Sequence, residues 1–203
     1  MKLSFLIAAL GLSSVAAFAQ SALDTPFQVR YAANLNIADS YVNISNSGAS
    51  TTGSSFSGLS NGTLCVNVYA FAPDEQLVDC CTCSVSPNSV YSLSVNNDLN
   101  SNTLTGVREN SLVIKLLATT GGTCNAATPG TPAAGLLAWG TTVHRLSGTT
   151  TYQTTETAFT PSTLSAGELA RISQLCSFTQ ILGSGFGVCG SCRNIALGSQ
   201  SSQ

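Results

Sequence analysis

Eight cysteines are the residues of this sequence that could carry chemistry. Cys80-Cys81-x-Cys83 together with Cys189-x-x-Cys192 supplies enough thiolates for a tetrahedral zinc ion. The second motif could instead exchange thiols with disulfides, but it follows a predicted helix, whereas a reactive thiol favours a helix N-terminus. The third interpretation is a framework of four disulfides. The cysteines are Cys65, Cys80, Cys81, Cys83, Cys124, Cys176, Cys189 and Cys192.

The N-terminal residues favour the disulfide interpretation. Lys2, the apolar run 3–12 and the small-x-small sequence Ala17-Phe18-Ala19 have the form of a secretory signal peptide spanning residues 1–19. Cysteines normally pair in an oxidising compartment. We therefore predict a secreted protein, extracellular or at the cell surface, with four disulfides, no metal and no cofactor.

Other catalytic groups are few. His144 is the single histidine, and it lies in a strand-like run. Asp74 and Glu75 form a turn pair, which favours solvation over glycoside chemistry. We expect His144 to be a half-exposed strand residue, and we predict that the protein is not an enzyme.

Asparagines suggest two further sites. Residues 96–98, Asn100 and Asn102 offer oxygens to calcium, but the calcium-loop pattern is absent, so we expect a hydrogen-bonded turn. Asn43 and Asn61 begin N-x-[ST] sequons, which matter only in a host that glycosylates them.

The composition is poor in charge. Only 8% of the residues are charged and the net charge is −2, so no basic patch can attract nucleic acid. No segment after the signal reaches 18 apolar residues, so no transmembrane segment is predicted. A nearly neutral polar surface gives little repulsion between copies, which favours self-association.

The predicted elements are mostly strands. Ser165 and Glu168 form a capping box that begins the one clear helix, with Leu169, Ile172 and Cys176 on its apolar stripe. We predict a mainly β fold: a disulfide-stapled β-sandwich of about seven or eight strands with one C-terminal α-helix. It forms a single β-rich domain over residues 20–198, followed by a polar tail at 199–203. The predicted extended segments are 27–37, 41–44, 64–71, 77–83, 90–95, 112–118, 136–146 and 151–159.

One hairpin is predicted in detail. A turn at 73–75 would place residue i opposite residue 148 − i, so Cys65 would face Cys83 and bond to it. Adjacent Cys80 and Cys81 would point to opposite sides and need separate partners. Helix residue Cys176 would then bond one of the remaining cysteines.

Aromatic and threonine side chains offer a binding alternative. Trp139 with Tyr69, Tyr91 and Tyr152 could form a stacking platform for carbohydrate, although a sandwich more often buries such a Trp in its core. The Thr-rich run 149–157 could form a ladder of hydroxyl groups that binds sugar or ice. The alternative is that it forms only a solvated strand face.

Four motifs carry a family resemblance: the run from Asn34 to Ile44; Cys65-Val66-Asn67-Val68-Tyr69 with Cys80-Cys81-Thr82-Cys83; Trp139-Gly140-Thr141-Thr142; and the run from Gly183 to Cys189 with Cys192. With these motifs the chain resembles an uncharacterised secreted cysteine-rich protein family of soil bacteria, of the acidobacterial type. The resemblance implies export and a bacterial origin, and it assigns no functional residue.

The resulting hypothesis is a secreted structural or cell-surface protein, a self-assembling subunit of an extracellular filament or matrix. Its partners would be other copies of itself or other surface proteins, and a neighbour's sheet would accept its N-terminal strand by β-augmentation. The alternative is a secreted carbohydrate- or surface-binding module with a polysaccharide partner. The assembly-strand residues would be Phe27, Val29, Tyr31, Leu35 and Ile37; the alternative, which we favour for this segment, is an ordinary strand of its own domain.

Overall fold

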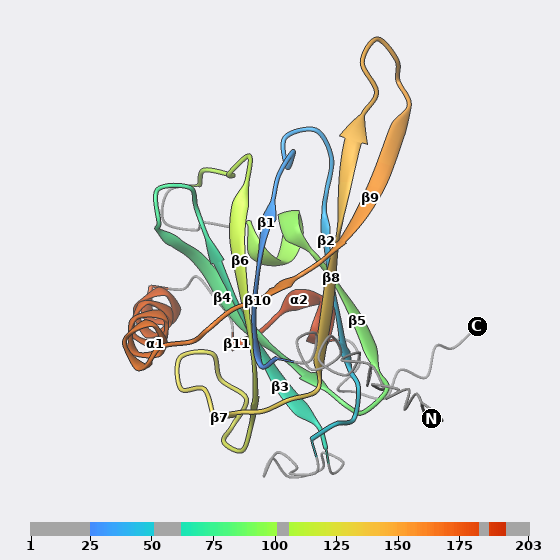
Figure 1. The fold of residues 1–203 in the computed structure, drawn as a ribbon. Coiled ribbons are helices and arrows are strands. Elements are labelled where there is room, and N and C mark those ends of the chain that lie inside the picture. The colour runs from blue at the N-terminus through green and yellow to red at the C-terminus, as the bar shows by residue number, and fades with distance from the viewer. Residues whose placement is uncertain (1–24, 51–61, 101–105, 183–186, 194–203) are drawn as a thin grey trace, which may run out of the picture.

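Two β-sheets stacked on each other and one long helix make up this computed structural model (Figure 1). The structure describes residues 25–50, 62–100, 106–182 and 187–193. The predicted signal at 1–19 and tail at 199–203 lie outside these residues. The mainly β class, the two-sheet sandwich and the C-terminal helix are confirmed.

The first sheet, sheet A, forms the middle layer and has the order β10-β1-β6-β3-β4-β11, with β7 paired to β6. Its central strand β6 is the nearly uncharged run that the sequence predicted. The strands are β1 (Phe27–Ala32), β3 (Leu64–Phe71), β4 (Leu77–Val85), β6 (Leu112–Thr120), β7 (Thr131–Pro132), β10 (Thr160–Pro161) and β11 (Gly187–Val188).

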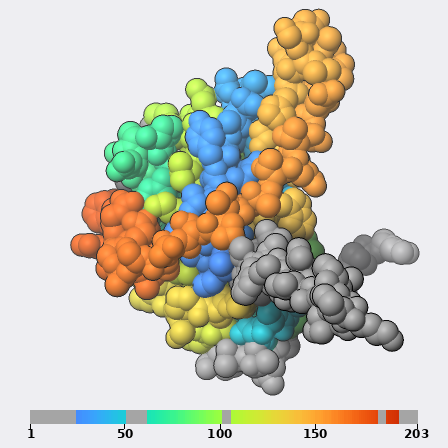
Figure 2. All heavy atoms as spheres, in the orientation of Figure 1, coloured from blue at the N-terminus to red at the C-terminus, as the bar shows by residue number. Residues whose placement is uncertain are grey.

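The second sheet, sheet B, has the order β5-β2-β8-β9 and all of its pairs are antiparallel. The β8–β9 hairpin projects well beyond the rest of the molecule (Figures 1 and 2). The strands are β2 (Tyr41–Asn46), β5 (Val90–Ser94), β8 (Leu136–Arg145) and β9 (Tyr152–Ala158).

Apolar side chains pack on both faces of sheet A. One cluster fills the space between the sheets, with Val66, Val68 and Leu116 of sheet A against Val42 and Ile44 of sheet B. A second cluster lies on the opposite face, under the helix. Since both faces of sheet A are covered, all eight residues of β3 are buried and the strand lacks a solvent-facing alternation.

The helix α1 (Ala166–Ile181) begins as the capping box predicted, since the Ser165 hydroxyl accepts the Glu168 N–H at 3.1 Å. Ile172, Cys176 and Thr179 form its buried stripe. The Glu168 carboxylate does not return to the cap, but binds Lys115 of β6 and thereby ties α1 to the sheet.

The predicted β3–β4 hairpin is present, but its register is wrong by one residue along most of its length. Phe71 lies opposite Leu77 as expected, whereas Ala70 lies opposite Asp79, so Val78 has no partner. Beyond this bulge Cys65 faces Ser84, and Cys83 faces Val66. Because a one-residue shift moves side chains to the other face, Cys65 and Cys83 lie on opposite faces of sheet A.

No helix in the described part of the chain has both the length and the apolar character to cross a membrane.

Candidate functional site

The four disulfides divide evenly between the two faces of sheet A. Cys80–Cys176 fastens β4 to α1, and Cys65–Cys124 lies on the same face. Cys81–Cys189 and Cys83–Cys192 fasten β4 to the C-terminal turn on the face toward sheet B. The predicted Cys65–Cys83 bond is therefore wrong, because the bulge separates these two cysteines. The separate partners of Cys80 and Cys81 are confirmed.

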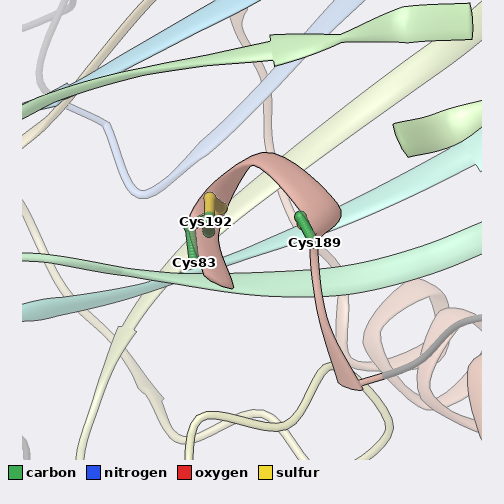
Figure 3. Close-up of side chains that lie close together, drawn as sticks. All are labelled: Cys83, Cys189 and Cys192. Carbon is green, nitrogen blue, oxygen red and sulfur yellow. A yellow bond between two sulfur atoms is a disulfide. The ribbon is translucent and has the colours of Figure 1, made fainter. Parts of the chain in front are cut away.

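The two disulfides on the sheet B side form a cluster of sulfur atoms. Cys189 precedes the short helix α2 (Gly190–Arg193), Cys192 lies within it, and Cys83 lies on the strand beneath (Figure 3). The sulfur atoms of Cys83, Cys189 and Cys192 lie within 4.8 Å of one another. A metal would need thiolates, and here each of these sulfurs is bonded to another.

A small pocket of about 210 Å³ opens beside this cluster. Cys81 and Cys189 line it together with two acids, Asp79 of β4 and Asp98, and the basic residue Arg193. Asp79 is only 5% exposed. Its pKa is raised to about 7, chiefly by burial; the hydrogen bond from the Cys80 N–H opposes this rise, and the nearby Asp98 carboxylate adds to it.

Asp98 connects three segments beside the pocket. It belongs to the π-helical turn η1 (Val95–Leu99), and its carboxylate accepts the Ser94 N–H at 2.9 Å and both the N–H and the hydroxyl of Ser191, at 2.9 and 2.5 Å. Asn100 donates to the Asn96 side chain and to the Glu109 carbonyl. The predicted hydrogen-bonded turn is confirmed at these residues, and Asn102 lies outside the described residues.

His144 lies on β8 and is half-buried, as expected for a strand histidine. Its Nε2 is 2.8 Å from the Thr155 hydroxyl, and its Nδ1 is 3.4 Å from the Asn34 amide. Neither neighbour is a nucleophilic thiol or a carboxylate, so this arrangement lacks a triad around His144.

Arg30 is a charged residue that the sequence reasoning missed. It is 8% exposed and lies between the sheets, where it donates to the hydroxyls of Thr142 and Thr157 at 2.6 and 3.0 Å. Burial lowers its pKa. A side chain at Gly140 would overlap with the guanidinium group, so Gly140 makes room for it. A lone charge in an apolar strand, as at Arg30 and Asp79, is the signal that could have found both.

The outer face of sheet B carries a hydrogen-bonded ladder. Ser92 of β5 donates to Asn43 of β2 at 2.5 Å, Asn43 donates to Thr141 of β8 at 3.3 Å, and Thr141 donates to Glu156 of β9 at 3.3 Å. Asn43 is 8% exposed. Both ends of its amide are engaged, so its sequon is covered in the folded chain, and Asn61 lies outside the described residues.

The aromatic platform predicted from sequence does not form. Tyr69 is fully buried under α1 with its hydroxyl on the Ala126 carbonyl, and burial raises its pKa. Tyr91 packs against the core between the sheets, and Tyr152 is exposed on the projecting hairpin. Trp139 is half-buried and pairs with Asn43 on the outer face of sheet B, so the alternative of a core Trp is also wrong.

The segment predicted for assembly lies within its own sheet. Phe27, Val29 and Tyr31 belong to β1, which pairs with β6 at all six residues and with β10 at Gln28 and Val29. The extended conformation ends at Ala32, earlier than predicted. Leu35 and Ile37 lie in a following turn, which the left-handed backbone of Asn34 begins (φ 63°).

The strand β9 presents the longest exposed edge of the projecting hairpin. All seven of its residues are exposed, and among the described residues it pairs with β8 alone. Glu156 is its single charged residue, and it contains neither proline nor lysine. It is the strand predicted from the Thr-rich run.

No family model, curated protein or solved structure matches this chain.

Proposed function

We propose that this is a secreted structural or cell-surface protein whose copies associate edge to edge through β9. Four disulfides are consistent with an extracellular protein, and no described helix is suited to span a membrane. The observation that carries the proposal is the unpaired edge of β9. Natural proteins usually protect such edges with lysine, proline or a bulge, because the free N–H and C=O groups accept another strand.

The proposed occupant of this edge is β9 of a second copy. An antiparallel pair centred on Thr155 would place Thr154 opposite Glu156 of the other copy, so the two carboxylates would not face each other. The two four-stranded sheets would become one continuous sheet. The small net charge of −2 adds little repulsion between copies.

In this proposal β9 takes the role that the sequence suggested for residues 27–37. Donation of β1 to a neighbour's sheet would require it to leave β6, with which it forms a complete ladder. Pairing through β9 requires no such rearrangement, since its outer edge has no strand partner among the described residues.

Charge substitutions at Thr154 test this register. Thr154→Glu would place two like-charge pairs across the dimer, and Thr154→Lys two opposite-charge pairs. Each pair contributes about 0.2–1 kcal/mol, so the dimer dissociation constant should rise several-fold with Glu and fall several-fold with Lys. Sedimentation over a range of protein and salt concentrations measures both changes.

The control is Tyr31→Glu, on an exposed residue of the other sheet, which should leave the association unchanged. Wild-type protein that stays monomeric at millimolar concentration would contradict self-association. Equal effects of Glu and Lys at residue 154 would contradict pairing through β9.

A second candidate is the binding of a neutral polysaccharide on the outer face of sheet B. It is favoured by the ladder of hydroxyl, amide and carboxylate groups across four strands, with Trp139 and the 42% exposed Tyr41 on the same face. Aromatic rings with adjacent polar groups suit sugar rings, which have both apolar faces and hydroxyl edges.

Sedimentation with insoluble neutral polysaccharides tests this candidate. We expect Tyr41→Ala and Trp139→Ala to abolish co-sedimentation with the polysaccharide. Tyr31→Ala, at a tyrosine that is 59% exposed on the other sheet, should still co-sediment. Wild-type protein that remains in the supernatant with cellulose, chitin and starch alike would exclude this function.

A further inference from the structure

We propose that the Cys81–Cys189 and Cys83–Cys192 disulfides form a thiol–disulfide exchange relay that an external dithiol reduces. The inference is independent of the proposed function, since it concerns β4 and the C-terminal turn and does not involve β9. It rests on a pocket, a sulfur cluster and a buried acid that occur together.

The pocket supplies the route by which a reductant reaches the first disulfide. Cys81 and Cys189 are 2% and 1% exposed, and both line the 210 Å³ pocket. On the other face of sheet A, Cys80 and Cys176 are both fully buried within the cluster under α1. Reduction by an external thiol requires access to the sulfur, so the two faces should differ in reactivity.

The sulfur cluster supplies an internal acceptor. If a thiolate of the dithiol attacks Cys81, a mixed disulfide forms and Cys189 leaves as a thiolate. That thiolate lies within 4.8 Å of the sulfurs of both Cys83 and Cys192. It can attack Cys192, which forms a Cys189–Cys192 bond and releases Cys83 as a thiolate.

The backbone of the C-terminal turn favours this new bond. The Cys192 N–H donates to the Cys189 carbonyl at 2.9 Å, which closes a turn across the Cys-x-x-Cys sequence. The ends of such a turn are less than about 7 Å apart, within the range that a disulfide can bridge.

The second thiol of the reductant completes the exchange. It attacks the reductant's own sulfur in the mixed disulfide. The reductant then leaves in its oxidised, disulfide form, and Cys81 is released as a thiolate. Two electrons and two protons thus pass from the dithiol to Cys81 and Cys83. One protein disulfide, Cys189–Cys192, remains in place of two, and the C-terminal turn is no longer bonded to β4.

Asp79 is placed to supply a proton to the Cys81 sulfur when it departs from the mixed disulfide in the last step. It lies two residues before Cys81, so the two side chains share a face of β4, and both line the pocket. The charged groups that face it there are Asp98 and Arg193. Asp98 is engaged with Ser94 and Ser191, and Arg193 donates to the Val188 carbonyl. Among the described residues at the pocket, Asp79 is therefore the acid with one oxygen left over, since the Cys80 N–H binds the other.

Graded reduction of the native protein tests the relay. The half-exposed Cys124 makes Cys65–Cys124 an easy competing target, so the experiment uses a variant with both Cys65→Ser and Cys124→Ser. The protein is treated with a limiting dithiol, alkylated, and mapped by mass spectrometry. We expect the first two-electron product to carry alkylated Cys81 and Cys83 and a Cys189–Cys192 bond.

Two products would overturn the proposal. One is a species with alkylated Cys81 and Cys189 in which Cys83–Cys192 is intact, since this shows reduction without exchange. The other is earlier loss of Cys80–Cys176, since this shows that the pocket gives no preferred access.

The pH dependence tests the role of Asp79. At a fixed concentration of the attacking thiolate, the rate at which Cys81 is released should be up to about tenfold higher at pH 6 than at pH 8 in the wild type, because Asp79 loses its proton near pH 7. Asp79→Asn should remove this dependence of the rate on pH. Asp74→Asn, which changes an exposed acid in the turn, should leave it unchanged. An unchanged profile in Asp79→Asn would contradict proton donation by this residue.

Discussion

Cys80 and Cys81 are adjacent along β4 and bind to opposite sides of the molecule. The Cys80 sulfur is bonded to Cys176 in α1, and the Cys81 sulfur is bonded to Cys189 before α2. The disulfide that holds α1 and the disulfide that holds the C-terminal turn are therefore attached to neighbouring residues of β4. Displacement of β4 would disturb both outer layers together.

Removal of the Cys80–Cys176 bond should affect α1 first. The double variant Cys80→Ala with Cys176→Ala should lose about 2–4 kcal/mol of unfolding free energy, as is typical when a long loop is released. Hydrogen exchange should accelerate across residues 166–181 more than in β6. As a control, Cys65→Ala with Cys124→Ala should leave the hydrogen-exchange protection of α1 unchanged. Faster exchange in β6 than in α1 after loss of Cys80–Cys176 would contradict this assignment.

Asp79→Asn should stabilise the protein at neutral and alkaline pH. The folded pKa is raised from 3.8 to about 7, so the folded state binds more protons than the unfolded state between these values. Stability therefore falls as the pH rises from about 4 to 7, and the amide variant avoids this loss. Denaturant melts should show a gain of about 2–4 kcal/mol at pH 8 and little change at pH 4.

Asp74→Asn provides the control for these melts, because Asp74 is exposed in the β3–β4 turn. An Asp79→Asn gain that is equal at both pH values would show that the carboxylate charge is not its cause.

Gly140→Ala should destabilise the fold through Arg30. The added methyl group would overlap with the guanidinium group, which packs between β8 and β1. Forced overlap in a packed interior costs about 1–3 kcal/mol. In an Arg30→Ala background the same substitution should cost much less, and a double-mutant cycle measures the difference. Equal costs in both backgrounds would place the effect in the backbone of β8.

Tyr69→Phe should destabilise the protein by about 1–3 kcal/mol, because it leaves the buried Ala126 carbonyl without its donor at 2.8 Å. Thermal unfolding gives the change in stability, and the carbonyl stretch of a labelled Ala126 reports the lost bond. Tyr152→Phe, at an exposed tyrosine of β9, is the matched control and should leave the stability unchanged.

The sequence was a good guide to the elements because their signals are local. Alternation defines β3, the Thr-rich run defines β9, a run that is apolar except for Lys115 defines β6, and Ser165 with Glu168 defines the start of α1. These patterns depend on residues close in the chain, so they could be interpreted without knowledge of the fold.

The disulfide pairing was not predictable, because it depends on one residue that the local pattern conceals. Val78 bulges out of β4 and reverses the faces of every residue between it and Val85 relative to β3. Alternation in a hairpin buried on both sides is equally compatible with either register. The pocket at Asp79 is likewise assembled from segments almost a hundred residues apart, since Asp98 and Arg193 both line it.

The passage from β9 to β10 connects the projecting hairpin to both sheets. A single residue, Phe159, separates β9 of sheet B from β10 of sheet A, and this residue is only 2% exposed. A force applied to the tip of the hairpin would be transmitted through this continuous backbone. It would load the hydrogen bonds between strands in both sheets in shear. Shear breaks many hydrogen bonds at once rather than one after another, so a tether attached there should resist force better than one attached at α1.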